Sequence, residues 1–122
     1  MSSISAAKIV RSILLDSDVS KKVNKIYPVV VDKAEKPYIV FRRVSMTPTR
    51  AKNVIVEDSA IVQVLVITDD YDSGLVIAED VRKALDCKDL TDYGVEECIL
   101  TNASETWMDD AFVQDLYFTI KI

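Results

Sequence analysis

The chain has 122 residues, 49% of them apolar and 29% charged, with a formal net charge of −5 at pH 7. This length and composition predict one soluble domain spanning residues 1–122. The absence of histidine removes the commonest general base, and two glycines cannot form a glycine-rich phosphate loop. We therefore expect a protein that is not an enzyme and has no cofactor.

The sequence shows no membrane or secretion signal. Its longest apolar run, residues 61–67, is far shorter than the ~20 residues of a membrane span. Cys87 and Cys98 do not form a CxxC pair, and two cysteines cannot supply a four-ligand zinc site. We expect an intracellular protein with two buried or half-buried free thiols; a disulfide is the alternative.

Apolar residues near the N-terminus recur at helical spacing and predict a helix over residues 5–15, with Ser5 as its cap. A short helical turn is expected within residues 18–24. The apolar positions of the first helix are Ala6, Ile9, Val10, Ile13 and Leu14.

Residues 26–31 and 38–44 are rich in β-branched and aromatic side chains and predict two strands. Pro28 cannot donate to a ladder, so the first strand should lie at an edge or carry a bulge. Two further strands are expected over residues 95–106 and 112–122, with a turn at Asp109 and Asp110 between them.

Residues 54–68 predict an unusually long strand. Fully extended, it would measure roughly 50 Å at ~3.3 Å per residue, whereas a domain of this size is under ~30 Å across. The polar segment 45–53 precedes it. We therefore expect residues 44–58 to project as a hairpin or loop; a loop folded back on the domain is the alternative.

Within this strand, residues 61–67 are apolar on both faces, whereas a sheet with one wet face would alternate. We expect one face to be covered by a helix and the other by a second helix or a neighbouring subunit. The two sets are Ile61, Leu65 and Ile67 on one face, and Val62, Val64 and Val66 on the other.

The acidic residues Asp69, Asp70 and Asp72 precede a helix that ends near residue 85. They could bind Mg²⁺ or Ca²⁺, but the segment lacks the glycine and terminal glutamate of a calcium loop. Helix capping explains them better, so we expect no metal site. The helix has an apolar stripe of Gly74, Ile77, Ala78, Val81, Ala84 and Leu85.

This order of elements predicts an α+β fold. We expect a mostly antiparallel sheet of about four to five strands with the N-terminal helix and the second helix packed on it, plus the projecting hairpin or loop.

Charge is divided unevenly between the two parts of the chain: residues 1–52 carry a net +7 and residues 53–122 a net −12. Two such molecules could dock head to tail and form a ring or a filament. The alternative is that the charges mix on a solvated surface. The overall acidic chain argues against a dedicated DNA-binding protein.

Basic residues gather around the expected projection, and a tryptophan lies beside the predicted turn at residues 109–111. We predict that these residues contact a partner; a solvated surface and ordinary packing of the tryptophan are the alternatives. The predicted interface residues are Arg42, Arg43, Thr47, Arg50, Lys52, Val54 and Trp107.

Several short motifs occur in a recognisable order. Ile26-Tyr27-Pro28 is followed by Pro37-Tyr38-Ile39-Val40-Phe41, Gln63-Val64-Leu65-Val66, Asp69-Asp70-Tyr71, Val81-Arg82-Lys83-Ala84-Leu85-Asp86 and the closing strand 116–122. This order resembles the tail completion proteins (tail terminator, or tail-to-head joining) of long-tailed bacteriophages and prophages. The resemblance covers nearly the whole chain. Cys87 stands where such proteins often have a glycine.

The resemblance implies a non-enzymatic ring, commonly of six copies, that caps the tail tube and ends its polymerisation. The implied partners are other copies of the chain, the tail-tube protein and the head connector protein. DNA would pass through the ring without sequence-specific binding. Residues 45–58 would lie across a neighbour or into the tube.

The resemblance also implies assembly in the host cytoplasm and a final location in the virion tail. The alternative function is a small-ligand-binding or regulatory α+β module with the sheet face as the floor of a pocket.

Overall fold

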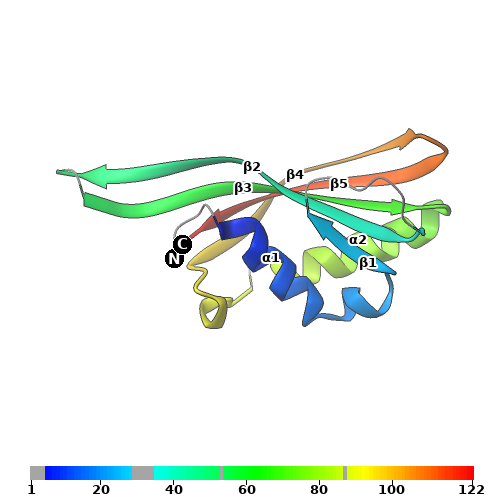
Figure 1. Ribbon diagram of the computed structural model, residues 1–122, viewed down its shortest axis with the longest axis horizontal. Coiled ribbons are helices and arrows are strands. Elements are labelled where there is room, and N and C mark those ends of the chain that lie inside the picture. Colours follow the sequence, from blue (N-terminus) through cyan, green and yellow to red (C-terminus); the bar gives the residue numbers. More distant parts are fainter. Residues whose placement is uncertain (1–4, 29–34, 53, 87) are drawn as a thin grey trace.

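A computed structural model describes residues 5–28, 35–52, 54–86 and 88–122; the side chains at positions 49–51 and 54–57 lie outside the described part (Figure 1). The described residues form two α-helices, five strands and two short 3₁₀ turns. These are α1 (Ala6–Leu15), η2 (Asp18–Lys21), β1 (Lys25–Pro28), β2 (Tyr38–Ala51), β3 (Val54–Thr68), α2 (Tyr71–Leu85), η3 (Thr91–Tyr93), β4 (Glu97–Met108) and β5 (Ala111–Lys121).

The strands form one sheet in the order β1-β2-β3-β5-β4. The β1–β2 pair is parallel, and the β2–β3, β3–β5 and β4–β5 pairs are antiparallel. Figure 1 shows α1 and α2 on the same face of this sheet. The predicted α+β fold, with a mostly antiparallel sheet and both helices packed on it, is confirmed.

Helix α1 buries the predicted apolar face, because all five predicted positions are buried. Ser5 lies at the N-cap position but makes no side-chain capping hydrogen bond, so the predicted cap is wrong. Its backbone, at φ −89° and ψ 7°, lacks the extended conformation that aims a capping side chain at the first turn.

Helix α2 begins in the acidic segment, as predicted, and the structure shows that Asp70 is its cap. The Asp70 carboxylate accepts hydrogen bonds from the backbone N–H of Ser73 (3.0 Å) and from its hydroxyl (2.9 Å). The predicted stripe is buried at Gly74 and four further positions, and Ala84 is half-buried. Gly74 lies so close to β3 that a Cβ atom would stand 2.9 Å from the hydroxyl of Thr68.

The first strand is an edge strand, as Pro28 indicated. Its described residues are Lys25–Pro28, at one edge of the sheet. It pairs with Tyr38–Phe41 of β2. The part of the prediction that falls on residues 29–31 lies outside the described residues.

The second strand was predicted to end at Val44 but continues to Ala51, so the polar segment is largely strand. Irregularities in the ladder fall between Arg43 and Ser45 and between Thr49 and Arg50. Residues 45–53 are mostly polar and show no alternation of apolar residues, so no strand pattern could be recognised there from sequence. The expected projection is a hairpin, and the folded-back loop is wrong (Figure 1).

The core lies between the sheet and the two helices. Val62, Val64 and Val66 of β3 are completely buried there, together with Phe118 of β5. On the opposite face Ile61, Leu65 and Ile67 are only half-buried. The described residues place no helix on that face, so a second helix covering it is wrong, and a covering neighbour remains a prediction.

The structure describes one of the two cysteines that were predicted to be buried or half-buried. Cys98 is buried on β4, with 2% of its surface exposed. Cys87 lies outside the described residues.

Replacing Gly74 by alanine should destabilise the fold by about 1–3 kcal/mol, the usual cost of overpacking. The obstructing Thr68 is 1% exposed and its hydroxyl donates to the Asp70 carbonyl oxygen at 2.7 Å, so it cannot easily move. Chemical denaturation measures the free energy of unfolding.

The control is a double-mutant cycle with Thr68→Ala, which removes the obstructing hydroxyl. Gly74→Ala should be less destabilising in that background. An equal effect in both backgrounds would contradict the proposed clash.

Candidate functional site

The most distinctive feature of the molecule is the β2–β3 arm, residues 45–58. β3 pairs with β5 only from Ser59 onward, and Asp58 adds a last pair of backbone hydrogen bonds to Ile122 (3.0 and 3.5 Å). Beyond Asp58 the described residues of the arm pair only with one another. Figure 1 shows the arm extending past the helices at one end of the molecule.

Four predicted interface residues lie on this arm. Thr47 is exposed, and Lys52 occupies the turn with a φ of 51° and is also exposed. Arg50 pairs with Ile55, and Val54 with Ala51, so both backbones lie near the tip. The side chains of Arg50 and Val54 lie outside the described part.

The other two predicted arginines, Arg42 and Arg43, lie at the root of the arm. They line a cavity of about 480 Å³ between α1 and the β1–β2 edge, which we call the basic cleft. Its apolar lining residues are Ala7, Pro28 and Phe41, and its cationic ones are Lys8, Arg11, Arg42 and Arg43. No acidic side chain is among the described residues that line it.

Lys8 and Arg11 are the site residues that sequence reasoning missed. Their spacing of three places them on one side of α1, and both are exposed. This pattern marks a polar helix face but does not say which strand that face borders. Neither residue forms an ion pair within the described part of the chain.

Arg42 also takes part in a polar network on the helix-free face of the sheet. Its Nε donates to Gln63 Oε1, and Gln63 Nε2 donates to Asp115 (2.9 Å) and to the Tyr117 hydroxyl (3.0 Å). Gln63 is 6% exposed. This network explains why glutamine interrupts the apolar run of β3: the buried amide joins three strands through hydrogen bonds.

Trp107 lies at the opposite end of the molecule, beside the turn joining β4 and β5 (Figure 1). Its ring contacts Phe112 at 4.7 Å between centroids, and Phe112 contacts Tyr71 at 5.7 Å. Trp107 is nevertheless 55% exposed and the adjacent Met108 57% exposed. The structure therefore separates Trp107 from the predicted basic residues.

Acidic groups surround this aromatic end. The predicted turn residues Asp109 and Asp110 have φ values of 52° and 60°, as in the two-residue turns that match strand twist. Lys36 pairs with Asp69 at 3.1 Å and donates to the Asp110 carbonyl oxygen at 3.4 Å. The turn is thus held in a defined position.

Glu105 links the aromatic end to β5. It accepts hydrogen bonds from the Tyr71 hydroxyl (2.8 and 3.0 Å) and from Gln114 (3.0 Å). The bonds from Gln114 and Tyr71 lower the pKa of Glu105. The same carboxylate raises the pKa of Tyr71, because it stabilises the protonated hydroxyl.

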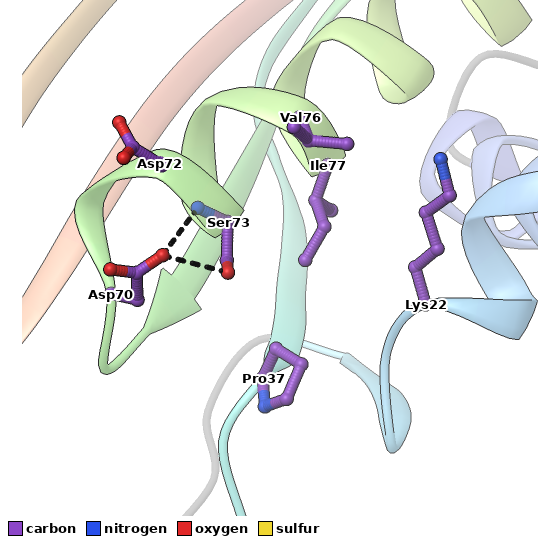
Figure 2. Close-up of a pocket in the computed structure, with 7 residues that line it drawn as sticks. All are labelled: Lys22, Pro37, Asp70, Asp72, Ser73, Val76 and Ile77. Atoms are coloured by element: carbon purple, nitrogen blue, oxygen red, sulfur yellow. Dashed lines mark hydrogen bonds between the residues drawn. The ribbon is translucent and has the colours of Figure 1, made fainter.

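A second hollow, of about 400 Å³, lies at the start of α2 (Figure 2). Most of its polar groups are already engaged, because Asp70 caps the helix through Ser73 and Lys22 pairs with Asp80, and Asp72 is the further acidic residue that lines it. Pro37, Val76 and Ile77 supply apolar surface. The hollow has the size of a small-ligand pocket but few available polar groups.

Comparison with known proteins gives a structural likeness. No protein-family profile and no curated protein matches the chain in sequence. Among solved structures, the fold is similar to a chain in the virion of a native gene transfer agent (GTA) particle, with a TM-score of 0.66 and 16% identity. The match covers 92% of this chain and 96% of that chain. At this identity the likeness shows a shared fold.

Within the described residues, none of the helices has the length and apolar character needed to span a membrane.

Replacing Glu105 by glutamine should return the pKa of Tyr71 toward its ordinary value, because the amide carries no negative charge. Since the folded-state pKa of Glu105 is lowered, its stabilising contribution is present above its ordinary pKa and is lost as the pH falls through the lowered value. Glu105→Gln should remove this contribution to acid sensitivity.

Nuclear magnetic resonance titration of the tyrosine rings measures the first effect, and Tyr71→Phe identifies the Tyr71 signal. An unchanged Tyr71 pKa in Glu105→Gln would contradict the assigned cause.

Proposed function

We propose that this protein is a non-enzymatic structural protein of a phage-type virion that forms a ring capping the tail tube. The arm is the observation that carries the proposal. Beyond Asp58 its described residues pair only with one another, and Lys52 at its tip is exposed. The described residues of this ribbon have no ladder partners outside the arm, which favours a role in contacting a neighbour.

The shared fold supports a role in a virion. The likeness to the gene transfer agent chain extends over nearly all of both chains, so it concerns the complete folds. The motif order from Ile26-Tyr27-Pro28 to the closing strand supports the narrower role of a tail terminator.

The helix-free face of the sheet supports assembly of several copies. Its half-buried apolar residues include three of β3 and one of β2, which pairs with the last of them: Ile61, Leu65, Ile67 and Tyr38. A neighbouring subunit would remove this apolar surface from water. Repetition of one heterologous contact closes a ring when the rotation between neighbours allows it. We propose six copies, as the resemblance implies.

In this role the ring ends polymerisation of the tail-tube protein and offers a surface to the head connector protein. DNA passes through the ring, where basic groups act on phosphates without reading the base sequence. The protein assembles in the host cytoplasm and remains in the virion tail.

Shortening the arm should abolish assembly and leave a folded protein. Residues 50–56 are replaced by Asn-Gly, which favours a two-residue turn between Thr49 and Glu57, paired neighbours in the ladder. Native mass spectrometry over a range of concentrations gives the oligomeric mass, and negative-stain microscopy with tail tubes from the same virus shows the caps. Wild type should form rings and the variant should not.

Circular dichroism checks the fold of the variant. Rings formed equally well by the shortened protein would contradict the role of the arm. A wild-type monomer that neither forms rings nor binds tail tubes would contradict the proposed function. It would favour the small-ligand alternative, for which the hollow of Figure 2 is the candidate pocket.

A further inference from the structure

Two surfaces at different places on this molecule have complementary chemistry. The β4–β5 tip, residues 107–110, presents Trp107 and Met108 with more than half of the surface of each residue exposed, next to Asp109 and Asp110. The basic cleft offers apolar residues beside the cationic residues Lys8, Arg11 and Arg43, whereas the Arg42 side chain is bonded to Gln63 on the other face of the sheet. One surface is apolar and acidic, and the other is apolar and basic.

The exposure of the tip is not a consequence of disorder. Asp109 and Asp110 form a tight turn with left-handed backbone at both positions, and Lys36 donates to the Asp110 carbonyl oxygen. Phe112 contacts the Trp107 ring in an edge-to-face arrangement, with an interplanar angle of 68°, and so restricts its position. Large, rigid and exposed aromatic side chains of this kind are typical anchors of protein interfaces.

The cleft is suited to receive such a tip. Its volume of about 480 Å³ is that of a pocket for a large side chain, and Phe41 and Pro28 provide apolar contacts. Lys8 and Arg11, which lack ion-pair partners within the described residues, supply positive charge at its border. An acidic turn would balance that charge while the Trp107 side chain enters the cleft.

The tip cannot reach the cleft of its own chain. Figure 1 shows the turn between β4 and β5 at one end of the longest axis, well away from α1 and from the end of β1. Contact between tip and cleft therefore needs a second copy. It uses two different surfaces, so each copy can both donate a tip and accept one.

We infer that the β4–β5 tip of one copy docks in the basic cleft of the next copy. This inference rests on the proposed ring and assigns one of its subunit contacts. The contact is heterologous, with Trp107 against the apolar lining, and Asp109 and Asp110 facing Lys8 and Arg11. This contact acts in addition to the arm. The arm extends from the part of β2 that carries the cleft residues Arg42 and Arg43.

Two variants test the contact. The cleft variant is Lys8→Glu with Arg11→Glu, and the tip variant is Trp107→Ala with Asp109→Asn and Asp110→Gly. Asn-Gly keeps the turn because both residues accept a positive φ. Lys83→Glu with Lys88→Glu is the matched control, since these exposed lysines lie outside the cleft.

Each variant alone should fail to form rings, with subunit affinity weakened at least about 30-fold, as expected for loss of an interface hot spot. An equimolar mixture should give a one-to-one dimer and no larger species. In that dimer, the unmodified tip of the cleft variant docks in the unmodified cleft of the tip variant. The other cleft and the other tip both carry substitutions, so no further subunit can be added. Native mass spectrometry resolves these species.

Rings that persist in both variants would overturn this contact and leave the proposed ring standing. Wild-type rings combined with no dimer in the mixture would also overturn it. A wild type that forms no ring, alone or on tail tubes, would contradict the proposed function itself. Asp109→Asn with Asp110→Gly alone gives a second test, because it should weaken assembly without altering the aromatic contacts.

Discussion

The length of β3 is the constraint on which the rest of this molecule depends. It has 15 residues, about 50 Å at ~3.3 Å per residue, whereas β5 pairs with it only from Ser59 to Thr68. The helix layer needs the second half of the strand, where three valines are buried. The first five residues, 54–58, therefore overhang, and β2 follows them as the second strand of the arm.

The outer edge of β2 bears on how the arm can contact a neighbour. Within the described residues, β1 covers β2 only as far as Phe41, so the outer edge of β2 continues along the arm. That edge carries Pro48, which has no N–H, two ladder irregularities and several basic residues. These features disfavour addition of another strand. They leave side chains, and not the ladder of the sheet, as the groups through which the arm would contact a neighbour.

The parts of the fold that could be predicted from sequence are those with a strong periodic pattern. The helices and β3 have apolar residues at regular spacing because one face of each is buried, and their predicted ranges agree closely with the structure. The outer part of β2 could not be predicted in this way. It is stabilised by ladder hydrogen bonds with β3, which require no pattern of apolar residues.

By itself, the sequence determined which segments are amphipathic, where Asp70 starts a helix, that Asp109 and Asp110 turn the chain, and that basic and acidic residues are separated along it. These properties depend on neighbours within a few positions. Only the tertiary structure decided that Lys8 and Arg11 border the cleft containing Arg42 and Arg43, and that Trp107 lies far from them. Such groupings depend on how distant elements pack, since the packing of α1 against the sheet is set by the complete core.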